Sequence, residues 1–135
     1  MKKTFALIVF LMIIMISVTV SAKDIYCTTA LSGDMIYDYY VREESVELSQ
    51  CRYGKLWKIT IVQVGGAKYN KNYPPFYSSY SFYRDFNNVQ WCNVYHITSG
   101  YGGPHFRLTK RGKTLEEEIA WFARGIIALH EHEFK

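Results

Sequence analysis

Residues 45–64 read SVELSQCRYGKLWKITIVQV, two runs of alternating apolar and polar residues around a short loop that contains Gly54. Residues two apart on a strand share a face, so the first run sends Val46 and Leu48 to the same side. The second run does the same with three large apolar residues, Trp57, Ile59 and Ile61. Two such runs joined by a glycine-bearing loop predict an antiparallel hairpin.

Strand character recurs on both sides of this hairpin. Residues 36–41 combine tyrosine with β-branched residues and predict a strand, with 42–44 as the turn that follows it. Further strands are predicted at 80–83, 89–98 and 105–108. Loops are predicted at 67–79, 84–88 and 99–104, followed by a basic turn at 110–113.

The C-terminal part of the chain predicts one amphipathic helix. Thr114 and Glu117 have the spacing of a capping box, in which the threonine hydroxyl accepts from the amide of residue 117 and the glutamate reaches back to the threonine amide. Apolar residues then recur at helical spacing and define one face that must pack on something apolar, up to about His130. These residues are Leu115, Ile119, Phe122, Ile126 and Leu129.

Together these elements predict an α+β fold, a mostly antiparallel sheet of about five or six strands with the C-terminal amphipathic helix packed on one face. The chain contains no internal repeat and no linker long enough to separate two domains. We therefore expect a single domain over residues 23–135, which is long enough to bury its own core.

Residues 1–22 predict a cleaved signal peptide. Lys2 and Lys3 precede an apolar run from 5 to 20, which ends in the small residues Ser21 and Ala22. The alternative is a membrane anchor, but the run falls short of the roughly 18 to 20 residues that span a bilayer. We expect a periplasmic or extracellular protein with no membrane span after signal cleavage.

The charge balance is small. The chain has 16 basic and 12 acidic residues, a net charge of +4 that falls to +2 when Lys2 and Lys3 leave with the signal. A balance this close to neutrality predicts neither a nucleic-acid partner nor an acidic polymer as substrate.

Three cysteines lie in the expected mature domain, at Cys27, Cys51 and Cys92. An exported protein meets an oxidising compartment, so we expect one disulfide bridge among the three, and the sequence does not select the pair. The third thiol would be a buried hydrophobic group, an intermolecular link or a nucleophile.

An aromatic loop gives the first candidate site. Its rings are Tyr69, Tyr73, Phe76, Tyr77 and Tyr80, around a stiff Pro74-Pro75 pair. Tyrosine offers rigid amphipathic contact area, so the loop is a candidate binding surface for another protein, such as a secreted enzyme or toxin, or for a surface glycan. The competing interpretation is a loop that folds back to cover the core.

A second candidate site comes from His96, His105 and Arg107 around a glycine-rich turn, where an acid, a base and a cation would suit phosphodiester transfer. The competing interpretation is a tight hairpin with surface histidines. Cys92 and His96 lie too far apart on one strand to form a thiol–imidazole pair. The histidines of the C-terminal tail point in different directions on a helix, so no metal site is predicted there.

No motif is specific enough to name a function. The sequence favours a binding protein without a cofactor, most plausibly an inhibitor or immunity-type protein that docks a macromolecule through the aromatic loop. The alternative is a small secreted hydrolase, specifically a nuclease, and a third hypothesis is a structural role in the cell envelope that uses an exposed sheet edge.

Overall fold

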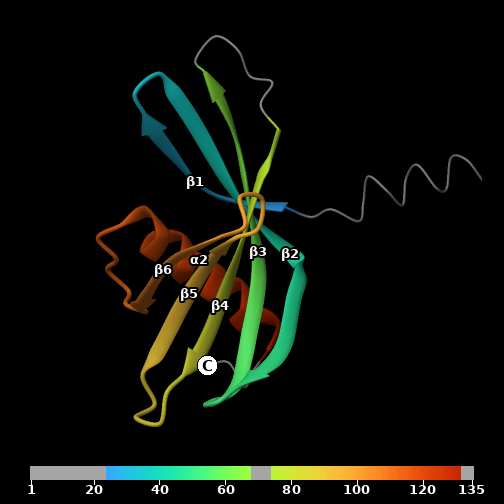
Figure 1. The fold of residues 1–135 in the computed structure, drawn as a ribbon, viewed down its shortest axis with the longest axis vertical. Coiled ribbons are helices and arrows are strands. Elements are labelled where there is room, and N and C mark those ends of the chain that lie inside the picture. The colour runs from blue at the N-terminus through green and yellow to red at the C-terminus, as the bar shows by residue number, and fades with distance from the viewer. Residues whose placement is uncertain (1–23, 68–73, 132–135) are drawn as a thin grey trace, which may run out of the picture.

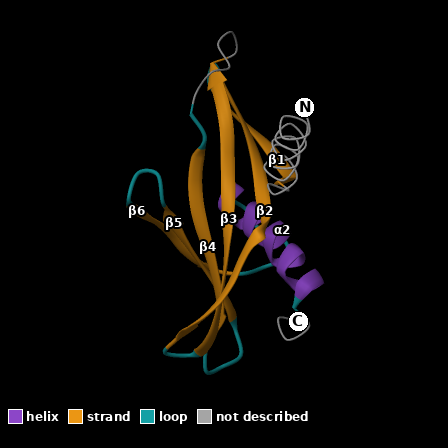
Figure 2. Cartoon of the chain, turned by 90° about the vertical axis from the view of Figure 1, so that its right-hand side faces the viewer, coloured by secondary structure: helices purple, strands orange, loops and turns teal. Residues whose placement is uncertain are grey.

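The structure is a computed structural model that describes residues 24–67 and 74–131. Its six strands form one antiparallel sheet in which each strand pairs with the next along the chain, and a single helix packs against one face (Figures 1 and 2). The predicted α+β fold is confirmed. The elements are β1 (Asp24–Ser32), β2 (Met35–Cys51), β3 (Gly54–Ala67), β4 (Phe76–Arg84), β5 (Gln90–His96), β6 (Tyr101–Arg107) and α2 (Leu115–His130).

The predicted hairpin is the β2–β3 pair, which lies between β1 and β4 in this sheet. β2 and β3 pair antiparallel up to Cys51 opposite Gly54, and Gly54 has φ 123°, a backbone conformation that side-chain-bearing residues rarely adopt. The expected alternation on β3 is also confirmed, because its three large apolar residues are all buried. They are Trp57, Ile59 and Ile61.

The turn expected at 42–44 is wrong, because β2 continues through it as one strand of 17 residues. The extra residues form a bulge between Arg42 and Glu47 in the pairing with β3. The Ser45 hydroxyl donates to the Arg42 carbonyl at 2.6 Å and accepts from the Thr60 amide at 2.7 Å. The Ser45 side chain thus bonds backbone groups at the bulge, where the regular hydrogen bonds between β2 and β3 are interrupted. The strand can therefore bend there without ending.

One strand was not predicted, and two others begin earlier than predicted. β1 was not predicted, since its residues lack a clear alternation, and residues 76–79 and 101–104 form strand where loops were expected.

An ion pair between Arg42 and Asp24, with Nε 3.0 Å from Oδ1, links the start of β1 to β2. Pro104 fits in β6 because this is an edge strand, where a residue without an N–H is tolerated.

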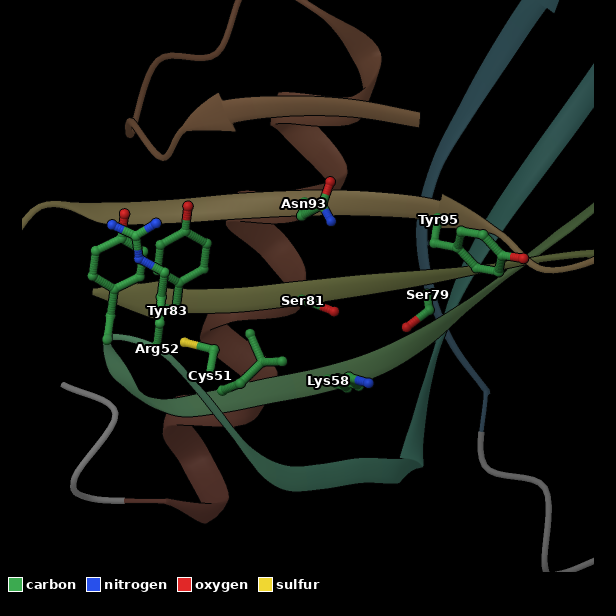
Figure 3. A pocket seen from close by; sticks show the side chains of 10 residues that line it. Cys51, Arg52, Lys58, Ser79, Ser81, Tyr83, Asn93 and Tyr95 are labelled. Carbon is green, nitrogen blue, oxygen red and sulfur yellow. The ribbon is translucent and has the colours of Figure 1, made fainter. Parts of the chain in front are cut away.

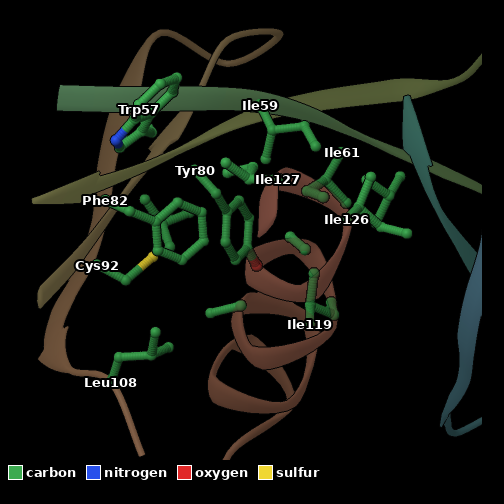
Figure 4. Close-up of a cluster of buried hydrophobic side chains, with 14 residues drawn as sticks. Trp57, Ile59, Ile61, Tyr80, Phe82, Cys92, Leu108, Ile119, Ile126 and Ile127 are labelled. Atoms are coloured by element: carbon green, nitrogen blue, oxygen red, sulfur yellow. The ribbon is translucent and has the colours of Figure 1, made fainter. Parts of the chain in front are cut away.

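The core lies between the sheet and α2 (Figure 4). Phe82 and Val94 from the sheet meet Ile119 and Ile127 from the helix, all at most 1% exposed. Ala120 and Ala123 are fully buried, because small side chains let the helix backbone approach the sheet closely.

The buried face of α2 is rotated from the predicted one. Ile119 and Ile126 are buried as expected, but Leu129 is 75% exposed and Ile127 is buried in its place. The helix begins with the predicted cap, in which the Thr114 hydroxyl accepts from the Glu117 amide at 3.2 Å. The predicted bond from the Thr114 amide back to Glu117 is wrong. The Glu117 carboxylate instead accepts from the Lys113 amide and from the Thr114 hydroxyl.

Two helix positions test this rotation. We expect Ile119→Ala to lower the free energy of unfolding by about 3 kcal/mol, because it opens a cavity against the sheet. We expect Leu129→Ala to change it by less than about 0.5 kcal/mol, because that side chain lies in solvent. Urea unfolding followed by circular dichroism measures both, and equal losses would contradict the rotation.

Candidate functional site

The face of the sheet opposite α2 carries a groove. It crosses β3, β4 and β5 and has a volume of about 480 Å³ (Figure 3). Figure 1 shows α2 on the far side of the sheet, with no described helix in front of these strands. Its lining combines aromatic, hydroxyl, amide and cationic side chains. The ten residues are Cys51, Arg52, Tyr53, Leu56, Lys58, Ser79, Ser81, Tyr83, Asn93 and Tyr95.

Strand register explains why this part of the face is hollow. Ser81 lies between Lys58 on β3 and Asn93 on β5, and Ser79 lies beside Tyr95. Two small side chains on the central strand therefore form a low floor, and Tyr83 stands at one end of it. Positions 79 and 83 are roughly 13 Å apart at a rise of about 3.3 Å per residue, so the floor is a few residues long.

The Tyr83 end of the groove is a packed aromatic cluster. The rings of Tyr53 and Tyr83 stack with centroids 5.2 Å apart and an interplanar angle of 6°, and the Arg52 guanidinium lies 4.7 Å from the Tyr53 ring centroid. The Tyr83 hydroxyl forms a 2.8 Å hydrogen bond with His105 Nε2. Each ring is held by a neighbour, so this end of the groove is preformed.

The same face continues beyond the groove onto the ends of β1, β2 and β3, which project past α2 (Figure 1). Leu31 pairs directly with Ile36, and Val64 lies on the same side. Their exposed fractions are 75%, 40% and 40%. We call these three side chains the apolar arm patch.

The described binding residues expected from the sequence lie in a strand and not in a loop. Tyr69 and Tyr73 lie outside the described residues, and Phe76 and Tyr77 are half-buried at the start of β4 rather than in a loop. Tyr80 is 3% exposed and belongs to the core, so its assignment to a binding surface is wrong. The alternation of β4 turns it towards α2, and burial raises the pKa of its hydroxyl.

The two histidines of the hydrolase hypothesis do not come together. His96 lies on the helix side of the sheet, where its Nδ1 forms a 3.0 Å hydrogen bond with the buried Ser78. His105 lies on the groove side, beside Tyr83, and Arg107 shares that side because it is two residues further along β6. One substrate cannot contact both histidines through the sheet.

The bridge expected among Cys27, Cys51 and Cys92 is not formed, since all three are free thiols. Burial raises the pKa of Cys92, and burial with the nearby Glu118 carboxylate raises the pKa of Cys27 to about 12. Cys92 is therefore a buried apolar group, and the half-buried Cys27 packs against the core, whereas Cys51 lies at the rim of the groove.

Thiol labelling checks this arrangement. In the native protein we expect iodoacetamide at pH 8 to modify Cys51 first. Cys27 and Cys92 should react at least about ten-fold more slowly than Cys51, because burial disfavours the reactive thiolate. In urea without reductant all three should react. Mass spectrometry counts the modified residues, and fewer than three in urea would reveal a bridge.

A loop at the edge of the aromatic cluster is organised by Asp85, which sequence reasoning missed. Its carboxylate accepts from Trp91 Nε1, the Asn87 amide and the Val89 amide, each at 2.9 Å. The Trp91 bond, followed by the backbone bonds, holds the pKa of Asp85 below its ordinary value. An aspartate just before an Asn-Asn turn is the sequence signal for such a loop anchor.

Replacing the indole donor should change how this loop responds to acid. Since the folded pKa of Asp85 is depressed, its contribution to stability is present above the ordinary pKa and is lost as the pH falls through the folded value. We expect Trp91→Phe to raise the pKa of Asp85 and to weaken this acid-dependent loss. Carboxyl NMR titration measures the pKa, with Tyr95→Phe as a control that should leave it unchanged.

Comparison with protein-family models, with curated proteins and with solved structures gives no match. No helix within residues 24–67 and 74–131 is long and apolar enough to cross a membrane. In that same part of the chain, no three histidine, cysteine or carboxylate side chains converge to hold a metal ion. The assignment of function therefore depends on the chemistry of the uncovered face.

Proposed function

We propose that this chain is a binding protein that docks a protein partner through the uncovered face of its sheet, in the manner of the inhibitor or immunity-type protein expected from the sequence. The observation that carries the proposal is that the groove and the apolar arm patch lie on the same face of the sheet, with Val64 six residues beyond Lys58 along β3. Exposed apolar side chains that cluster beside a groove are typical of interaction sites.

The composition of the groove supports a protein as the partner. Its lining is dominated by Tyr, Ser, Asn and Arg, as in the binding loops of antibodies, where tyrosine supplies rigid contact area and the small polar residues supply adaptable hydrogen bonds. The apolar arm patch would supply area from which water is excluded.

The scaffold also favours binding. The groove residues Lys58, Ser81 and Asn93 lie on three paired strands, and Tyr53 and Tyr83 are held by stacking. Side chains that are already ordered cost little further entropy on association. No observation favours the hydrolase alternative, because its two histidines face opposite sides of the sheet.

Two leucines of equal exposure test the proposed surface. Leu31 in the apolar arm patch and Leu129 on α2 are both 75% exposed. We expect Leu31→Lys to weaken capture of the partner at least about ten-fold, and Leu129→Lys to leave it unchanged, since only the first lies on the uncovered face. Ser81→Trp, which fills the groove, should also weaken capture.

The measurement is affinity capture on immobilised protein from envelope extract and culture supernatant of the producing cells, with the bound protein quantified by mass spectrometry. Thermal unfolding of each variant checks that the fold is kept. If the Leu31→Lys and Ser81→Trp variants are folded and still capture the partner as well as the unaltered protein, the uncovered face is not the docking surface.

A further inference from the structure

We infer that the groove is a subsite for carboxylate side chains, so that the protein partner presents an acidic segment to it. This inference rests on the proposed function and adds the chemistry of the partner. It comes from the charges, the hydrogen-bond donors and the engaged ring faces of the groove.

The charges in the groove have one sign. Its ten lining residues include two cations, Arg52 and Lys58, and no carboxylate. The neighbouring acids are Glu47, which pairs with Lys58 from β2 at the margin of the face, and Asp85, whose oxygens already accept three hydrogen bonds. An acidic group entering the groove therefore meets attraction along its floor.

Hydrogen-bond donors lie level with Lys58 and beyond it, on the side away from Arg52. The hydroxyls of Ser79 and Ser81 and the amide of Asn93 occupy the floor, and Lys58 lies level with Ser81 across the strands. Hydroxyl, amide and ammonium donors together suit a carboxylate, since hydrogen bonds to an ionised acceptor are stronger than those between neutral groups. The roughly 13 Å floor has room for about four extended residues.

At the Tyr83 end of the groove, the ring faces argue against a stacked base or sugar as occupant. Tyr83 is flanked by Tyr53 and by His105, whose ring centroid lies 5.9 Å away, and Tyr53 is covered by the Arg52 guanidinium. Bases and sugars gain affinity by stacking on open aromatic faces. This end of the groove presents ring edges and charge instead, which favours an acidic peptide.

The test is an NMR titration of the purified ¹⁵N-labelled protein with two blocked peptides, tetraglutamate and tetraglutamine. We expect tetraglutamate to cause saturable shifts of the Ser79, Ser81 and Asn93 amides with a dissociation constant on the order of 1 mM, weakening as salt is added. Tetraglutamine, which has nearly the same shape without the charge, should bind at least about five-fold more weakly.

Charge variants give opposite expected effects. Lys58→Met should weaken tetraglutamate binding about five-fold, and Glu47→Gln should strengthen it about two-fold, because each removes a charge beside the floor. Lys110→Met is the matched control, since Lys110 is an exposed lysine in the segment between β6 and α2 and should leave binding unchanged.

The outcomes separate this inference from the proposed function. If tetraglutamate shifts no groove amide, or if tetraglutamine, oligothymidylate or the neutral trisaccharide maltotriose binds there more tightly, the groove is not a carboxylate subsite. The proposed function still stands in that case if Leu31→Lys and Ser81→Trp abolish partner capture. If tetraglutamate binds as expected but neither variant affects capture, the docking proposal fails and the carboxylate subsite stands as a separate site.

Discussion

The packing of α2 against one face of the sheet is the interaction on which the rest of the structure depends. Ile119 and Ile127 bury themselves against Phe82 and Val94, and this layer is the core of the described domain. A single helix can cover only one face of a six-stranded sheet. Within the described residues the opposite face has no such cover, and small, polar and aromatic residues line the groove that lies there.

The sequence predicted which segments form strands and helices better than it predicted the contacts those segments make with one another. The central hairpin and the C-terminal helix follow from local periodicity, and both are confirmed. The bulge after Arg42 was missed because it depends on a bond from Ser45 to the neighbouring strand, and Leu129 was misplaced because Ile119 and Ile126 belong to two overlapping helical faces. Local spacing cannot distinguish those faces until the sheet that covers one of them is known.

The candidate site was harder to predict than the fold for the same reason. The sequence shows the alternation along β4 of Tyr77, Ser79, Ser81 and Tyr83. It does not show the pairing register between β3 and β4, which places Lys58 beside Ser81. Net charge was also a poor guide, because a nearly neutral total conceals a separation of charge. Three glutamates occupy the first turn of α2 on one side of the sheet, whereas Arg52 and Lys58 line the groove on the other.

The free thiols have a consequence for how the chain reaches its fold. Each strand pairs with its neighbour in sequence, so every pairing in the sheet joins consecutive segments of the chain. All three cysteines are free thiols in the described fold, so that fold itself contains no step that requires an oxidant. If residues 1–22 direct export, as the sequence predicts, the chain is able to fold on the reducing side of the membrane, and folding then competes with translocation. A chaperone that keeps the hairpins apart, or translocation coupled to synthesis, would resolve this competition in favour of export.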